Sequence, residues 1–171
     1  MNPEGYKTIL FTSNLSAASR IAFQHAALLA KQFRAKLILL HVMERLPGNY
    51  EGYMVGLFGQ DKFQEVLKRH KDEARHALVG KVSPGQMAKT ALSELYFELA
   101  ASETGSDAPE IVVKNGEVVE VILQVAEERS CDLIIMGAGE GLLSSSAIGR
   151  PIKSILKQSK IPVLIVPSVS E

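Results

Sequence analysis

The chain has 171 residues, 46% of them hydrophobic, which predicts one α/β domain spanning residues 1–171. Lys+Arg and Asp+Glu each number 19, and this zero formal net charge argues against a nucleic-acid-binding protein. No apolar stretch approaches the roughly 20 residues of a membrane span, and the first residues lack a long apolar signal segment. We therefore expect a cytoplasmic protein that binds neither nucleic acid nor membrane.

The first part of the chain has the pattern of a β–α–β unit. Residues 7–11 form a short apolar strand, Ser16 stands at the N-cap of a helix over residues 17–33, and residues 36–43 form a second, almost continuously apolar strand. The helix residues expected to face the sheet are Ile21, His25, Leu28 and Leu29. This order predicts a right-handed parallel crossover.

The middle of the chain is predicted to be an insertion between the second and third strands. Residues 44–60 hold many glycines and leave the carboxyl end of the second strand, which is the ligand edge of an open α/β sheet, so this loop is a candidate lid. Inserted helices are expected over about residues 61–101, as one helix from 61 to 80 and another from 87 to 101.

The second half alternates strands and helices. Strands are predicted at 110–114, 132–136 and 161–166, and helices at 117–129 and 152–158, with Glu117 placed favourably for the helix dipole. Five strands separated by helices predict an α/β fold with a five-stranded doubly wound parallel sheet, in the order 3-2-1-4-5. That order places the ends of strands one and four side by side, so Asn14 and Gly137 are expected to be neighbours.

A glycine-rich segment follows the fourth predicted strand. It contains Gly137, Gly139 and Gly141, then a serine-rich loop, and then Gly149-Arg150-Pro151 at the start of a helix. Glycines let the backbone approach an anion, and the first N–H groups of a helix have no partner within it, so this order favours a phosphate site. The alternative is that the glycines only make a tight strand-to-loop turn.

Three separated segments resemble the universal stress protein family. They are KTILFTSNLSAASRIAFQHAALLAKQFRAKLILLHVM from Lys7, NGEVVEVILQVAEERSCDLIIMG from Asn115, and SKIPVLIVP near the end of the chain. The resemblance implies an adenine nucleotide alpha hydrolase-like fold and a homodimer formed through the final strand, from Ile161 to Val166. It also implies that many relatives bind ATP through a G-x2-G-x9-G-[ST] signature.

The resemblance implies a set of nucleotide-binding residues in this chain. They are Thr12, Ser13, Asn14, Val42, Gly137, Gly139, Gly149, Arg150 and Lys153. The signature is altered, because Glu140 stands where its second glycine would fall and Arg150 where a hydroxyl residue would. Asn14 stands where ATP-binding relatives carry aspartate; its amide can bond a ribose but is a weak ligand for Mg²⁺.

Two functions remain open from the sequence. One is a stress-response or signalling protein that binds an adenine nucleotide, ATP or AMP, with or without Mg²⁺. The other is a non-nucleotide interaction module that acts through its dimer and the inserted helices. An adenosine-binding enzyme of related fold is a third reading on fold analogy alone.

Catalysis has little support in the sequence. No nucleophile has an evident base, so no catalytic residue is expected and slow ATP hydrolysis would be a side activity. None of the four histidines pairs with further ligands at metal-binding spacing, so no protein-held metal is expected. The single Cys131 precedes an apolar run and is expected to be a buried structural thiol.

Overall fold

A computed structural model describes residues 4–43, 55, 58–69, 84–100, 108–138 and 150–168. Its strands are β1 (Thr8–Ser13), β2 (Lys36–Met43), β3 (Glu110–Asn115), β4 (Leu133–Ala138) and β5 (Val163–Pro167). Its helices are α1 (Ala17–Phe33), α3 (Gln60–Arg69), α5 (Pro84–Ala100), α6 (Val118–Glu128) and α7 (Arg150–Gln158). Most of the predicted lid, including residues 44–54, and residues 70–80 of the first inserted helix lie outside the described residues.

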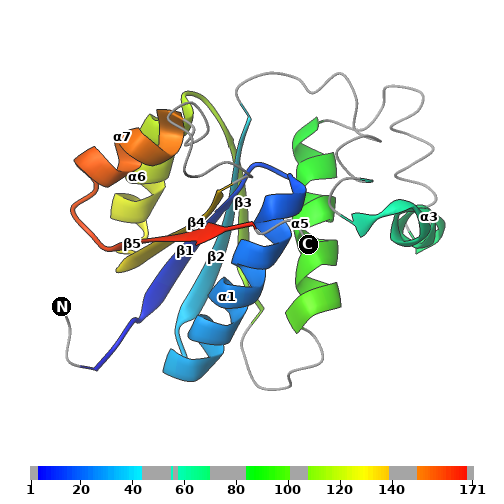
Figure 1. Ribbon diagram of the computed structural model, residues 1–171, viewed down its shortest axis with the longest axis horizontal. Coiled ribbons are helices and arrows are strands. Elements are labelled where there is room, and N and C mark those ends of the chain that lie inside the picture. The colour runs from blue at the N-terminus through cyan, green and yellow to red at the C-terminus, as the bar shows by residue number, and fades with distance from the viewer. Residues whose placement is uncertain are drawn as a thin grey trace.

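The five strands form one parallel sheet in the order β3-β2-β1-β4-β5, which confirms the predicted fold class (Figure 1). In the register, Thr12 of β1 lies beside Leu40 of β2 on one side and Met136 of β4 on the other. α1 and α5 cover one face of the sheet, and α6 and α7 cover the other (Figure 1). Strands one and four are therefore central neighbours, as the predicted order required.

The two faces are filled by alternate residues of the same strands, because successive side chains of a strand point in opposite directions. Ile9 and Phe11 of β1 pack with α1 and α5, whereas Leu10 packs with α6 and α7. The central strands are therefore apolar on both faces. This is why their sequences are continuous apolar runs rather than an alternation of apolar and polar residues.

The buried face of α1 differs from the predicted one. His25 and Leu28 are exposed, with 59% of Leu28 accessible, and Ile21 and Leu29 are only partly buried. The residues that pack on the sheet are Ala22, Phe23, Ala26 and Ala30. The prediction was wrong for His25 and Leu28, whereas Ile21 and Leu29 pack against the core from the edge of the buried face. Phe23 and three alanines face the sheet, and the small alanines let α1 lie close to β4.

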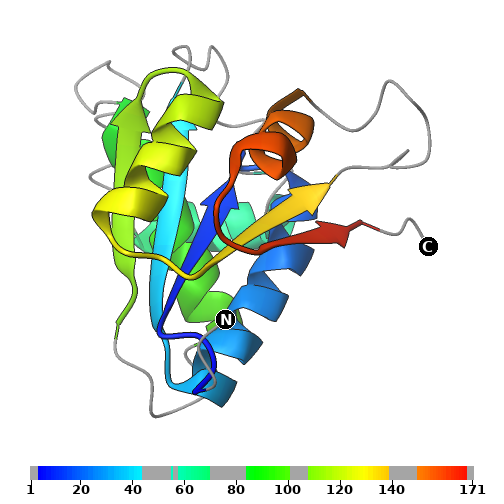
Figure 2. The same ribbon diagram turned by 90° about the vertical axis from the view of Figure 1, so that its left-hand side faces the viewer.

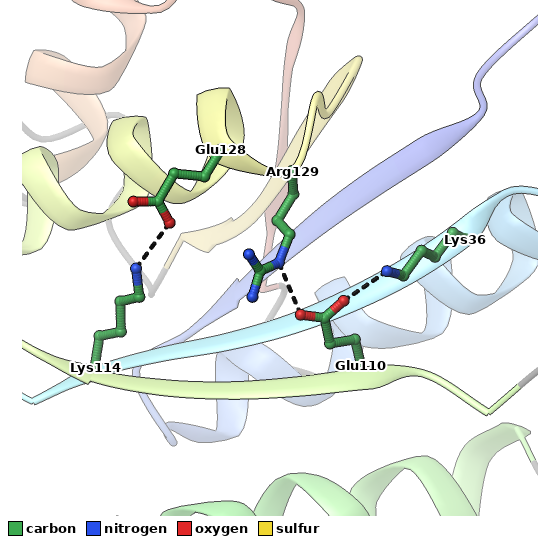
Figure 3. A network of polar contacts seen from close by, with 5 residues as sticks. All are labelled: Lys36, Glu110, Lys114, Glu128 and Arg129. Carbon is green, nitrogen blue, oxygen red and sulfur yellow. Dashed lines mark hydrogen bonds and ion pairs between the residues drawn. The ribbon is translucent and has the colours of Figure 1, made fainter.

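α6 begins and ends on polar contacts that fix its position. Glu117 is its N-cap, and the Glu117 carboxylate accepts hydrogen bonds from the N–H groups of Val119 (3.1 Å) and Glu120 (2.8 Å), in line with its predicted dipole position. Near the other end of α6, Arg129 and Glu128 form ion pairs with Glu110 (2.8 Å) and Lys114 (3.0 Å) of β3 (Figure 3). These contacts tie α6 to the β3 edge.

A carboxylate that the sequence analysis did not single out joins the beginnings of β1 and β4. Asp132 accepts hydrogen bonds from the backbone N–H groups of Lys7 (2.8 Å) and Thr8 (3.2 Å), and its own N–H donates to the Thr8 carbonyl oxygen (2.9 Å). The preceding residue, Cys131, is buried, and desolvation raises the pKa of its thiol to about 11. The prediction of a buried structural thiol is confirmed.

Candidate functional site

The carboxyl ends of β1 and β4 form the switch point of the sheet. After β1 the chain enters α1 on one face, and α7, the next described element after β4, lies on the other face (Figure 1). Ligands of open α/β sheets bind where neighbouring strands send their connections to opposite faces. Ser13 and Gly137 each follow the last register pair of these strands, Thr12 with Met136. Ser13 and Gly137, one from each predicted half of the site, thus lie at the same edge of the sheet.

The turn from β1 into α1 is held by its own side chains. Leu15 has a positive φ of 59°, which is unusual for a leucine, and it is buried. Ser13 Oγ accepts a hydrogen bond from the Leu15 N–H (3.0 Å), and Asn14 Oδ1 accepts one from the Ser16 N–H (3.0 Å) and one from Ser19 Oγ (2.9 Å). Ser16 is the N-cap as predicted, but its side chain makes no cap bond; Asn14 instead holds the turn through the Ser16 N–H and the Ser19 hydroxyl.

His41 supports the same turn from the neighbouring strand. Its Nδ1 lies 2.8 Å from the carbonyl oxygen of Ser13, its register partner in β1. A carbonyl oxygen only accepts, so Nδ1 carries the hydrogen and donates it. Burial lowers the pKa of His41, which favours the neutral ring. His41 falls within the apolar strand predicted at residues 36–43, and no local signal in the sequence marks its contact with Ser13.

Gly137 lies inside β4 and not in the loop after it. The strand extends to Ala138, two residues beyond its predicted end, and Gly137 pairs in register with Val166. A Cβ atom at Gly137 would lie 2.8 Å from the carbonyl oxygen of Ala18 and 3.2 Å from the Cβ of Ala22, both in α1. Close packing of α1 against β4 therefore requires a glycine at this position, whether or not a ligand binds.

The remaining predicted site residues divide into described and undescribed ones. Thr12 and Ser13 are buried, with 8% and 6% of each accessible, whereas Asn14 is exposed. Val42, near the end of β2, is partly buried and packs on the α6 and α7 side. Lys153 is exposed in the first turn of α7. Arg150 begins α7, and its side chain, like Gly139 and Gly149, lies outside the described part of the structure.

The described residues at this edge provide hydrogen-bond donors and an apolar contact rather than carboxylate ligands. Asn14 offers hydrogen-bond donors, Val42 offers an apolar contact, and the first turns of α1 and α7 contain no acidic residue. The amide oxygen of Asn14 already accepts two hydrogen bonds. Among the described residues no group of three or more His, Cys, Asp or Glu side chains is arranged to hold a metal ion. None of the described helices is long and apolar enough to cross a membrane.

Comparison with known families gives one match that covers nearly the whole chain. Residues 5–167 match the model of the universal stress protein family. Universal stress protein Sll1654 of Synechocystis sp. is 31% identical over 163 residues, covering 95% of this chain and 86% of the relative. Universal stress protein MJ0577 of Methanocaldococcus jannaschii is 26% identical over 162 residues and covers 94% of both chains.

Solved structures share the fold. The structure of MJ0577 is similar with a TM-score of 0.58 at 24% identity, covering 97% of this chain and 99% of that chain. A universal stress protein in complex with cAMP gives a TM-score of 0.55 at 20% identity, covering 95% and 98%. The Archaeoglobus fulgidus universal stress protein in complex with dAMP also gives 0.55, at 15% identity, covering 94% and 97%. At these identities the structures support the five-stranded fold.

Proposed function

Because this chain belongs to the universal stress protein family, we propose that it binds an adenine nucleotide at the carboxyl edge of its sheet and acts in stress response or signalling as a homodimer. The observation that carries the proposal is the preorganised turn of Ser13, Asn14 and Leu15 at the switch point. The cAMP and dAMP complexes of structurally similar proteins support an adenine nucleotide as the ligand class. A cytoplasmic location stays a prediction from the sequence.

Each part of a nucleotide has a candidate partner at this edge. The amide N–H groups of Asn14 suit ribose hydroxyls or phosphate oxygens, and Val42 suits the face of an adenine ring. The amino ends of α1 and α7 carry partial positive charge without an acidic residue in either first turn, and Lys153 adds a cation in the first turn of α7.

The homodimer is proposed to form through β5 rather than β3. Both are edge strands of the described sheet, and Figure 2 shows β5 at its outer edge with β4 as its strand neighbour. β3 carries Glu110 and Lys114, which are engaged in ion pairs, and charged edges disfavour further strand pairing. β5 has the uncharged sequence VLIVP, and Val163, Leu164 and Ile165 are only partly buried. Pairing with a second β5 would cover them.

A calorimetric titration of the purified protein with AMP and with ATP tests nucleotide binding. We expect saturable binding of at least one of them, weakened by Val42→Asp, which puts a carboxylate where the adenine is proposed to lie. Leu28→Asp, on the exposed outer side of α1, is the matched control and should bind like wild type. No heat of binding at millimolar nucleotide would rule out this function.

The alternative is an interaction module that binds no nucleotide, and one observation favours it. Gly137 is explained by its packing against Ala18 of α1, so this glycine no longer points to a ligand. Such a module would act through the dimer and the inserted helices, where Phe97 of α5 exposes 57% of its surface. The same titration separates the two functions, because only the nucleotide-binding protein releases heat with AMP or ATP.

A further inference from the structure

The hydrogen bonds of Asn14 fix which end of its amide is available to a ligand. The backbone N–H of Ser16 can only donate, so the atom that lies 3.0 Å from it must be the amide oxygen and not the nitrogen. The hydroxyl of Ser19, which is buried, donates to the same oxygen at 2.9 Å. An amide oxygen has two lone pairs, and both are used inside the protein.

Rotating the amide by half a turn would not free the oxygen at low cost. The NH₂ group would then face the Ser16 N–H, donor against donor, so the hydrogen bond from Ser16 would be lost, and the one with the Ser19 hydroxyl would persist only with that hydroxyl turned to accept. The turn also depends on them, since the positive φ of Leu15 is held between the contacts of Ser13 and Asn14. The amide nitrogen is thus the polar atom that this exposed side chain keeps for a ligand.

We propose that Asn14 makes the end of β1 a hydrogen-bond donor site, so that this protein binds its nucleotide without a divalent cation. The inference rests on the proposed nucleotide-binding function and specifies the ligand chemistry at the same edge. An amide N–H attracts ribose and phosphate oxygens but repels a cation, and the only acceptor atom of the side chain is already engaged. Metal-free nucleoside monophosphates such as AMP fit this site.

The inference is tested by two calorimetric titrations of the protein with AMP. One buffer contains EDTA in about fivefold excess over trace metal, and the other contains MgCl₂ at a concentration on the order of millimolar. We expect dissociation constants that agree within about twofold in the two buffers, since no step of binding uses the ion. AMP binding that is about tenfold or more weaker in EDTA would overturn the inference and leave the proposed function standing. No binding in either buffer would overturn both.

Asn14→Asp is the informative variant, because a carboxylate can still accept from Ser16 and Ser19 while its second oxygen replaces the donor. We expect AMP binding in EDTA to fall about fivefold or more, and MgCl₂ to restore part of the loss. Titration with Mn²⁺ alone, followed by its electron paramagnetic resonance signal, should show binding to the variant and not to wild type. Mn²⁺ bound by wild type and lost in Asn14→Ala would overturn the inference.

Discussion

His41 Nδ1 donates a 2.8 Å hydrogen bond to the carbonyl oxygen of Ser13, and this contact joins the ends of β2 and β1 where the chain turns into α1. Replacing His41 by leucine keeps the apolar volume but leaves the carbonyl of Ser13 without this buried donor. We expect the free energy of unfolding to fall by about 1–3 kcal/mol, measured by urea denaturation. His41→Gln, which can donate through its amide, should recover part of the loss; equal losses in both variants would contradict this role.

The same histidine gives a pH dependence whose sign follows from burial. Burial lowers the pKa of His41 below 6.5, so the unfolded chain takes up a proton that the folded chain refuses. The free energy of unfolding should therefore decrease as the pH falls below about 6.5, until the lower folded pKa is reached. Denaturation curves measured between about pH 5 and pH 8, a range set by the histidine pKa, give the free energy of unfolding at each pH. This free energy should change less with pH in His41→Leu than in the wild type. If the unfolding free energy of the variant depended on pH as strongly as that of the wild type, other groups would be the cause of the pH dependence.

Gly137→Ala tests whether packing against α1 is what requires the glycine. The new Cβ would meet the Ala18 carbonyl oxygen at 2.8 Å, and backbone cannot move aside as a flexible side chain can. We expect a loss of about 1–3 kcal/mol in unfolding free energy without any ligand present. Gly85→Ala is the control, since its nearest new contact, with Val113 in β3, would be an ordinary 3.9 Å. A variant of Gly137 as stable as wild type would refute the packing argument.

Asp132→Ala is expected to loosen the beginnings of β1 and β4. It removes the acceptors of the Lys7 and Thr8 N–H groups, and we expect a loss of about 1–3 kcal/mol in thermal or urea unfolding. Glu128→Ala, which breaks the exposed pair with Lys114, is the surface control and should change stability far less. If the two variants lost equal stability, Asp132 would be no more than another surface carboxylate.

Sedimentation tests the proposed dimer of β5. At micromolar concentration we expect a species of about twice the chain mass of 18.6 kDa. Ile165→Lys places a charge on the partly buried edge strand and should shift the equilibrium to monomer. The same change at an exposed site outside the edge, Leu28→Lys in α1, should leave the dimer intact. A single species near 18.6 kDa for wild type would contradict the dimer.

Much of the fold followed from local patterns. The predicted bounds of β2 and α1 agree with the structure, because a continuous apolar run and a capped helical segment are encoded by neighbouring residues. The strand order also followed, since right-handed crossovers leave few arrangements for five parallel strands. Strand ends were predicted less well, and β1 and β4 each extend two residues beyond the expected position.

The sequence by itself determined the sheet, its order and the edge where a ligand is expected, because apolar periodicity and chain connectivity are local properties. Only the tertiary structure decided what the residues at that edge do. Gly137 is required by α1, the alanine face of α1 is the buried one, and His41 bonds Ser13. These contacts join residues distant in the chain, and side-chain packing and hydrogen-bond direction exist only once the elements are assembled.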